Sequence, residues 1–235
     1  MYLVIPACKK FYLSLRQCLN VLQPQLRGDD SVIVVNLGMS IKQIKFLKSR
    51  NYKQIEFVNI DWSSINDDWK KDLNTYWFKS AIWTGLLNLK IKDIVLVIDS
   101  ACVVYNNLDT IEKLITKNII YSPYSDSDIE KWVYHKSRES IGFTLPTNLH
   151  MVSGGCLGVN LKHPIGNAFI EDFIKCCNNK DTLCPNESNK SNHRQDQSVL
   201  TMLYHLYHLK YKFPIIKKWV NIDYHKGIWP HEFYF

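Results

Sequence analysis

Apolar runs and segments of helical period alternate along the first hundred residues of the chain. Apolar runs predict strands at 2–6, 31–35 and 94–98, and a further strand is expected at 54–58. Apolar residues that recur every three or four positions predict helices at 11–22, 41–49 and 76–89. Such alternation is typical of a mainly parallel sheet with helices on both of its faces. We therefore predict an α/β fold.

The pattern is weaker in the second half of the chain. Residues 121–150 are rich in Ser, Asp, Lys and aromatic side chains without a clear period, which predicts a long irregular segment. Beyond it we expect a short strand at 157–160, helices at 168–177 and 195–209, and a polar loop at 184–193. With 235 residues, 46% hydrophobic content and no internal repeat, the chain is expected to form a single domain.

Charge and cysteine content narrow the class of protein. The net charge is +7, but the basic residues are spread along the chain, which suits an anionic small molecule at least as well as nucleic acid. No run of about 18 apolar residues occurs, and the N-terminal segment soon becomes charged, so we expect neither a membrane span nor a secretory signal. Seven cysteines without regular spacing indicate reduced thiols and a cytoplasmic location.

Asp99 is the first candidate site residue. It follows the apolar run 94–98 directly, where the predicted strand would leave the sheet. In open α/β sheets ligands bind outside the carboxyl ends of the strands, which would place Asp99 beside a bound ligand or its metal ion. The alternative, an acid that only caps a turn after a strand, explains this segment equally well.

Two further candidates lie later in the chain. Gly154 and Gly155 precede a predicted strand, and two residues without Cβ let the backbone approach a ligand closely, although a bulge or a tight turn is the simpler explanation. Asp196 falls in the first turn of the predicted helix 195–209, two residues after Arg194. A carboxylate there can serve as a general base, or it can simply complement the helix dipole.

Five segments, in this order, resemble the motifs of GT-A nucleotide-sugar glycosyltransferases. They are 36–40 (Asn-Leu-Gly-Met-Ser), 76–79 (Tyr-Trp-Phe-Lys), 99–101 (Asp-Ser-Ala), 153–160 (Ser-Gly-Gly-Cys-Leu-Gly-Val-Asn) and 193–198 (His-Arg-Gln-Asp-Gln-Ser). The order is similar to that in a glycosyltransferase-like family of nematodes and insects, and to that in sequences of large algal DNA viruses, whose enzymes of this type decorate capsid glycans. The resemblance covers roughly residues 30–210. Asn36 and Ala101 depart from it, because each stands where the family has an acid or, at the second position, Ser.

The resemblance implies a GT-A-like single domain, with residues 1–110 as the nucleotide-binding half and 111–235 as the acceptor-binding half. It implies transfer of a sugar from a nucleotide-sugar donor to a hydroxyl of an oligosaccharide or glycoprotein, in the host cytoplasm if the protein is viral. The donor is expected to be UDP-linked, and xylose is suggested by the viral resemblance alone. Nucleic acid is not an expected partner.

The resemblance also assigns roles to individual residues. Asp196 would be the base of an inverting transfer, but retaining members of the same fold carry an Asp-Gln pair at a similar place, so retention stays open. The residues expected to bind the donor are Pro6, Ala7, Lys79, Asp99, Ser100, Gly154, Gly155 and Arg194. Asp99 and His225 would hold a divalent cation, Mn or Mg, and the acid missing at Ala101 predicts that this ion is held weakly and with help from the donor phosphates.

Two other functions remain open at this point. Loss of an acid at Ala101 suggests a catalytically inactive module that binds a nucleotide or a glycan. The net charge of +7 suggests a polyanion-binding protein. Binding of UDP without turnover would favour the inactive module, and absence of UDP binding at moderate salt would leave the polyanion-binding protein.

Overall fold

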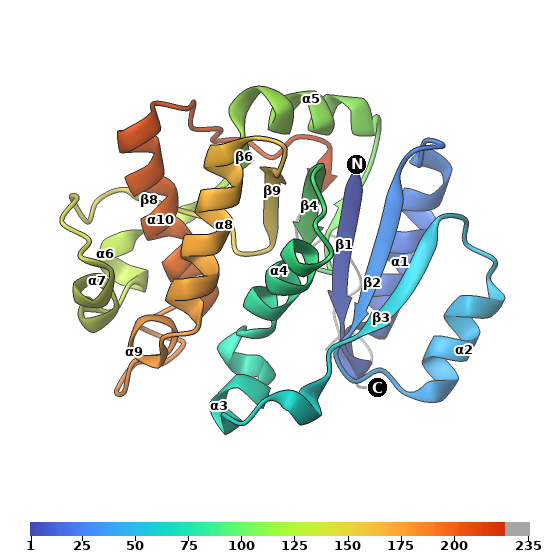
Figure 1. Cartoon of the computed structure of the whole chain (residues 1–235), viewed down its shortest axis with the longest axis horizontal. Helices are drawn as coiled ribbons and strands as arrows, with labels where there is room; N and C mark the ends of the chain where they lie inside the picture. Colours follow the sequence, from blue (N-terminus) through green and yellow to red (C-terminus); the bar gives the residue numbers. More distant parts are fainter. Residues whose placement is uncertain (224–235) are drawn as a thin grey trace.

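A computed structural model describes residues 1–223 of the chain, whose centre is a six-stranded sheet (Figure 1). The strand order is β3-β2-β1-β4-β9-β6. The pairs β3–β2, β2–β1 and β1–β4 are parallel, whereas β9 is antiparallel to both of its neighbours. The sheet is therefore mainly parallel, as predicted. Its strands are β1 (Tyr2–Ala7), β2 (Ser31–Asn36), β3 (Ile55–Asn59), β4 (Ile94–Ile98), β6 (Ile120–Tyr121) and β9 (Cys156–Asn160).

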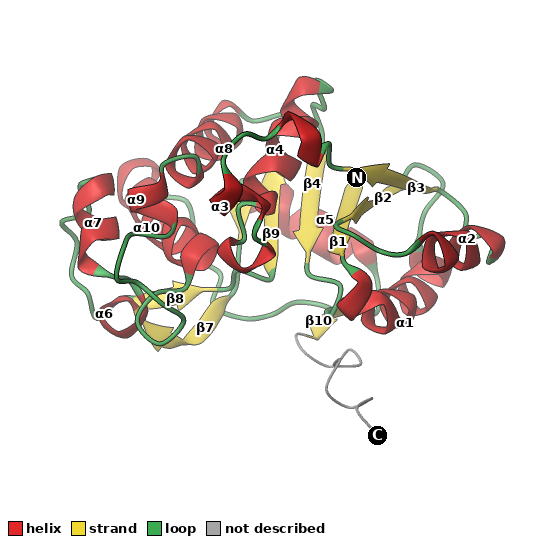
Figure 2. Cartoon of the chain, turned by 90° about the horizontal axis from the view of Figure 1, so that it is seen from below, coloured by secondary structure: helices red, strands yellow, loops and turns green. Residues whose placement is uncertain are grey.

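Helices cover both faces of this sheet (Figure 2). One face carries α4 (Phe78–Asn88), α8 (Pro164–Cys177) and α10 (Gln195–Tyr211). The other carries α1 (Tyr12–Leu22), α2 (Ile41–Ser49) and α5 (Leu108–Asn118). No helix within residues 1–223 combines the length and the apolar character that crossing a membrane requires.

The two faces are built by alternation along the strands. On β1, Val4 joins the hydrophobic core on the α4 and α8 side, whereas Leu3 and Ile5 join the core on the α1 and α5 side. On β4, Val95 and Val97 join the same core as Val4, on the α4 and α8 side. Because every residue of β4 is buried, the strand reads in the sequence as one continuous apolar run.

The segment 121–150 is not irregular, and this prediction is wrong. It contains short elements that gather at the end of the molecule beyond β9 (Figures 1 and 2). These elements are β7 (Tyr124–Asp128), α6 (Ile129–Trp132), α7 (His135–Ile141) and the first residue of β8 (His150–Val152). They are too short to show a period, and they are stabilised from elsewhere in the chain, since Ile129 packs in one cluster with Met151 and Met202.

Helix α5 was not predicted, although its signal is present in the sequence. Leu108, Ile111 and Ile115 form a buried stripe at helical spacing. The side chain of Asn107 accepts a hydrogen bond from the backbone N–H of Asp109 at 2.7 Å and so caps the first turn. The remaining elements of residues 1–223 are two short helices, α3 (Asp68–Lys71) and α9 (Lys180–Leu183), and a small ribbon of β5 (Val103–Val104) with β10 (Ile222–Asp223). There are also four 3-10 helices, at Lys9–Phe11, Gln23–Gln25, Trp62–Ser64 and Leu73–Thr75.

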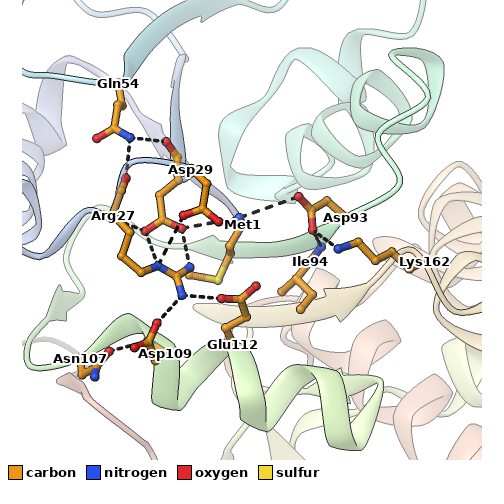
Figure 3. A network of polar contacts seen from close by, with 11 residues as sticks. Met1, Arg27, Asp29, Gln54, Asp93, Ile94, Asn107, Asp109, Glu112 and Lys162 are labelled. Atoms are coloured by element: carbon orange, nitrogen blue, oxygen red, sulfur yellow. Dashed lines mark hydrogen bonds and ion pairs between the residues drawn. The ribbon is translucent and has the colours of Figure 1, made fainter.

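A network of charged side chains fastens the segment before β2 to α5 (Figure 3). The guanidinium of Arg27 lies 2.6 Å from Asp30 and 2.5 Å from Glu112, and it also pairs with Asp109. The side chain of Asp30 is fully buried in this network. Such a buried carboxylate depends on its cation, because an uncompensated buried charge is strongly destabilising.

Asp30→Asn should therefore lower the free energy of unfolding by about 3 kcal/mol at pH 7. Burial by itself raises the pKa of Asp30, but hydrogen bonds from Arg27 outweigh it and hold the pKa below its ordinary value. The stabilisation is thus present above about pH 4, the pKa of an unfolded Asp, and is lost as the pH falls through the lower pKa of the folded state.

Urea unfolding of the wild type and of Asp30→Asn over a pH series measures this effect. The difference between the two proteins should shrink below about pH 4. Asp29→Asn is the matched control, since its side chain is 79% exposed and it lies 4.0 Å from the same guanidinium. Equal stability of Asp30→Asn and Asp29→Asn at pH 7 would contradict the role given to Asp30.

Candidate active site

A cleft opens at the carboxyl ends of β1 and β4, the edge at which open α/β sheets bind ligands. Its wider part is a cavity of about 490 Å³, and it adjoins a narrower part beside α10. Residues that line both parts are Tyr76, Asp99, Lys190 and Arg194. A cavity of this size suits a ligand larger than a simple ion.

Lys79 lines the narrower part of the cleft from the first turn of α4. Its ammonium Nζ is 2.5 Å from the carbonyl oxygen of Gly154, 2.9 Å from Oδ2 of Asp196 and 3.2 Å from Oδ1 of Asp99. The side chain is 7% exposed. These three oxygens come from three separate segments, namely the turn before β9, the start of α10 and the end of β4.

Asp99 is held at the end of β4 by its backbone. Its N–H donates to the carbonyl of Gly155 at 2.9 Å, and its own carbonyl accepts from the N–H of Cys102 at 2.9 Å. The carboxylate is 32% exposed and lines both parts of the cleft. Asp99 can therefore contact a ligand while one of its oxygens stays on Lys79.

Asp196 is the second residue of α10, and its side chain is almost completely buried. Burial raises the pKa of Asp196 above its ordinary value, and the nearby ammonium of Lys79 opposes this rise. A buried carboxylate that is kept ionised by one neighbouring cation is a common arrangement of a general base. Its place in the first turn of α10 agrees with the sequence prediction.

Gly154 makes room for the start of α10. A Cβ on this residue would lie 3.0 Å from Cβ of Gln197 and 3.3 Å from Oδ2 of Asp196. The space that its missing side chain leaves is thus filled by α10, and the carbonyl of Gly154 is free to face Lys79. The glycine contributes to the site by this close approach of two backbones.

Lys10, Lys190 and Arg194 line the wider part of the cleft, and the last two also line the narrower part. Lys190 donates to Oδ1 of Asn74 at 3.0 Å, and its Nζ lies 5.9 Å from the ring centre of Tyr76. The guanidinium of Arg194 lies 3.9 Å from the ring centre of Trp132. Arg194 was predicted, whereas Lys190 was missed, because it sits in a polar loop without a period and only the fold brings it to Asn74.

His193 supports the loop that carries these cations. Its ring is fully buried, its Nδ1 accepts from the N–H of Tyr134 at 3.3 Å, and its Nε2 faces the carbonyl of Leu183 at 3.0 Å. Burial lowers the pKa of His193 to about 4, so the ring is neutral at pH 7 and donates from Nε2. We assign it a structural role.

Comparison with known proteins identifies the architecture. No protein family model matches the sequence, and no curated protein matches it either. Among solved structures, the bifunctional glycosyltransferase WbbM in its apo form has a TM-score of 0.56 at 12% identity, over 87% of this chain and 37% of that one. A glutamine-to-glutamate active-site mutant of LgtC gives 0.54 at 16% identity, over 87% of this chain and 70% of that one.

Mouse xyloside xylosyltransferase 1, also in its apo form, has a TM-score of 0.54 at 12% identity, over 92% of this chain and 84% of that one. These neighbours and the mainly parallel sheet decide the fold. The chain has a GT-A-type fold. At identities this low the likeness concerns the fold of the GT-A domain alone, and the chemistry must be argued from the residues in its cleft.

The GT-A cleft brings together most of the residues singled out from the sequence. Those that line its wider part are Pro6, Ala7, Asp99, Ser100 and Arg194. Those that line the narrower part beside α10 are Lys79, Asp99, Gly154, Gly155, Arg194 and Asp196. His225 lies outside the described residues. The structure adds Tyr76, whose ring centre lies 5.5 Å from Nζ of Lys79 and 5.9 Å from Nζ of Lys190.

The described residues do not fit a site for a divalent cation. Asp99 and Asp196, the two carboxylates of the cleft, both pair with Lys79. Within residues 1–223 no group of three or more His, Cys, Asp or Glu side chains could hold a metal ion. Magnesium and manganese favour several oxygen ligands with negative charge, and here that charge already faces an ammonium.

Proposed function

We propose that the protein is a glycosyltransferase that moves a sugar from a nucleotide-sugar donor to a hydroxyl of an oligosaccharide or glycoprotein. One observation carries this proposal: a GT-A-type fold in which Asp99, Lys79 and Asp196 meet in the cleft at the strand ends. Each of these residues comes from a motif that resembles glycosyltransferases. Their meeting at one Nζ supports a shared role.

The cleft divides in a way that suits a nucleotide sugar. We assign the nucleotide, UDP in our proposal, to the wider part near Pro6, Ala7 and Ser100, in the half formed by residues 1–110. Lys190 and Arg194 lie where they can meet the negative charge of a diphosphate. The acceptor would then reach Asp196 from the half formed by residues 111–235.

In the inverting mechanism that we propose, Asp196 is the base. The acceptor oxygen forms a bond to the anomeric carbon while the bond from that carbon to the diphosphate oxygen breaks. The hydroxyl proton passes to the Asp196 carboxylate, and the nucleoside diphosphate leaves with the electron pair. Lys79 supports this role, because a cation 2.9 Å away favours the ionised carboxylate that a base requires.

Retention is a second candidate, and one observation favours it. The LgtC neighbour carries its active-site substitution at a glutamine. Here Gln197 follows Asp196, lines the narrower part of the cleft and donates to the carbonyl of Val152 at 2.8 Å. The anomeric configuration of the product, measured by NMR, distinguishes the two mechanisms.

Further details are proposals of the same kind. Xylose as the donor sugar and a place in viral glycan synthesis rest on the sequence resemblance alone. A cytoplasmic location is supported by all seven cysteines being free thiols. A Mn or Mg ion held weakly at Asp99 with help from the donor phosphates is the alternative that the sequence suggests, and it would require Lys79 to give up Asp99.

A panel of nucleotide sugars tests the proposal. We expect hydrolysis or transfer of at least one UDP-sugar, and we expect Asp99→Asn to weaken binding of that donor. Binding of UDP without turnover of any donor would instead support the inactive module suggested by Ala101. A protein that binds DNA or heparin at moderate salt but no nucleotide would contradict both.

A further inference from the structure

The positive charge between Asp99 and Asp196 is supplied by a side chain of the protein, the ammonium of Lys79. Nζ of Lys79 has three oxygens within 3.2 Å, one from the end of β4, one from the turn before β9 and one from the start of α10. Two are carboxylate oxygens and one is a backbone carbonyl oxygen. These are the ligand types that magnesium, calcium and manganese select in proteins.

We infer that the ammonium of Lys79 takes the place of a divalent cation between Asp99 and Asp196, so that sugar transfer proceeds without a metal. The part of this inference that concerns transfer rests on the proposed function. The part that concerns metal binding does not, because it follows from which oxygens Lys79 occupies.

Because Lys79 is buried, its ammonium is not easily displaced from between the two carboxylates. Its side chain is 7% exposed, and the ring centre of Tyr76 lies 5.5 Å from Nζ. If a divalent ion entered between the carboxylates, the ammonium would have to leave all three oxygens. Leaving these three oxygens would uncover a buried charge, so the exchange is unfavourable.

The charge balance of the cleft agrees with an internal monovalent cation. Lys79 together with Asp99 and Asp196 carries a net charge of −1, whereas a divalent ion in the same place would leave none. A diphosphate therefore needs cations from elsewhere. Lys190 and Arg194 line both parts of the cleft and supply them.

Manganese binding to the protein without substrate tests the inference, with free Mn²⁺ measured by electron paramagnetic resonance. The wild type should bind no Mn²⁺ at the cleft up to about 1 mM, a weak limit for protein sites of this kind. Lys79→Ala removes the ammonium and leaves the three oxygens, so this variant should gain one Mn²⁺ site. The double variant Lys79→Ala with Asp99→Asn should lose that site again.

Turnover supplies the second measurement. Wild-type transfer from the donor found active in the panel should be unchanged, within about twofold, by excess EDTA. Stoichiometric Mn²⁺ binding to the wild type that Asp99→Asn abolishes would overturn the inference, and so would loss of transfer in EDTA that Mn²⁺ restores. If Lys79→Ala does not fold, Mn²⁺ binding to the wild type and the effect of EDTA on wild-type transfer still test the inference.

The two proposals fail in different ways. Manganese binding is measured without a donor, so its result stands even if no nucleotide sugar is turned over. Absence of turnover with every donor, with and without added Mn²⁺, contradicts the proposed function. Turnover that strictly requires Mn²⁺ confirms a glycosyltransferase and contradicts the place given to Lys79.

Discussion

Asp196→Asn should lower turnover by roughly 10²-fold or more while leaving donor affinity nearly unchanged. The amide keeps the shape of the side chain and still offers an oxygen to the ammonium of Lys79, 2.9 Å away in the wild type. It cannot accept the proton of the attacking hydroxyl. A loss in turnover with unchanged binding is the signature of an interaction made only in the transition state.

Asp181→Asn is the matched control. Asp181 is also the second residue of a helix, α9, but its side chain is exposed and does not line the cleft. We expect normal turnover from this variant. Near-normal turnover of Asp196→Asn would make Asp196 a helix-terminal acid only, and a product with retained configuration would show that the transfer needs no simple base.

Removal of the two cations that line both parts of the cleft, by Lys190→Ala together with Arg194→Ala, should weaken UDP binding by about 100-fold. Each charge-assisted hydrogen bond to a diphosphate is worth about tenfold in affinity. The salt dependence of binding should fall as well, because fewer charges then take part. Titration calorimetry at two salt concentrations measures both effects.

Lys113→Ala together with Lys117→Ala removes the same charge from exposed positions on α5. This control should bind UDP within about twofold of the wild type, as expected for screened charges away from the ligand. Equal weakening in both double variants would mean that UDP responds to net charge alone. That outcome would favour a polyanion-binding surface over a specific donor site.

The continuous apolar runs of the sequence were sufficient to predict the long strands. Every residue of β4 is buried, and a strand that is covered on both faces has no polar positions to interrupt the run. The same run predicted that Asp99 lies at the end of β4, because Asp99 is the first polar residue after it. The elements between 121 and 150 could not be predicted in this way, because they are short and depend on packing against Met202 of α10.

The contacts of the site were less accessible to sequence reasoning than its residues. Lys79, Asp99 and Asp196 could each be singled out, but no local pattern indicates that they meet, since they come from α4, the end of β4 and α10. Lys190 was not predicted for the same reason, because its partner Asn74 is distant in the chain. Long-range packing, and not propensity, decides both.

Ligand protection of Cys8 tests most directly whether the cleft binds a nucleotide donor. Cys8 is half-buried and lines the wider part of the cleft, whereas Cys176 on α8 is half-buried and lies outside it. Burial also raises the pKa of Cys176 to about 11, so this thiol is a slowly reacting internal reference. Alkylation of both thiols is followed by mass spectrometry with and without UDP. We predict that saturating UDP slows alkylation of Cys8 and leaves Cys176 unchanged. Alkylation of Cys8 at the same rate with and without millimolar UDP would contradict a donor site in this cleft.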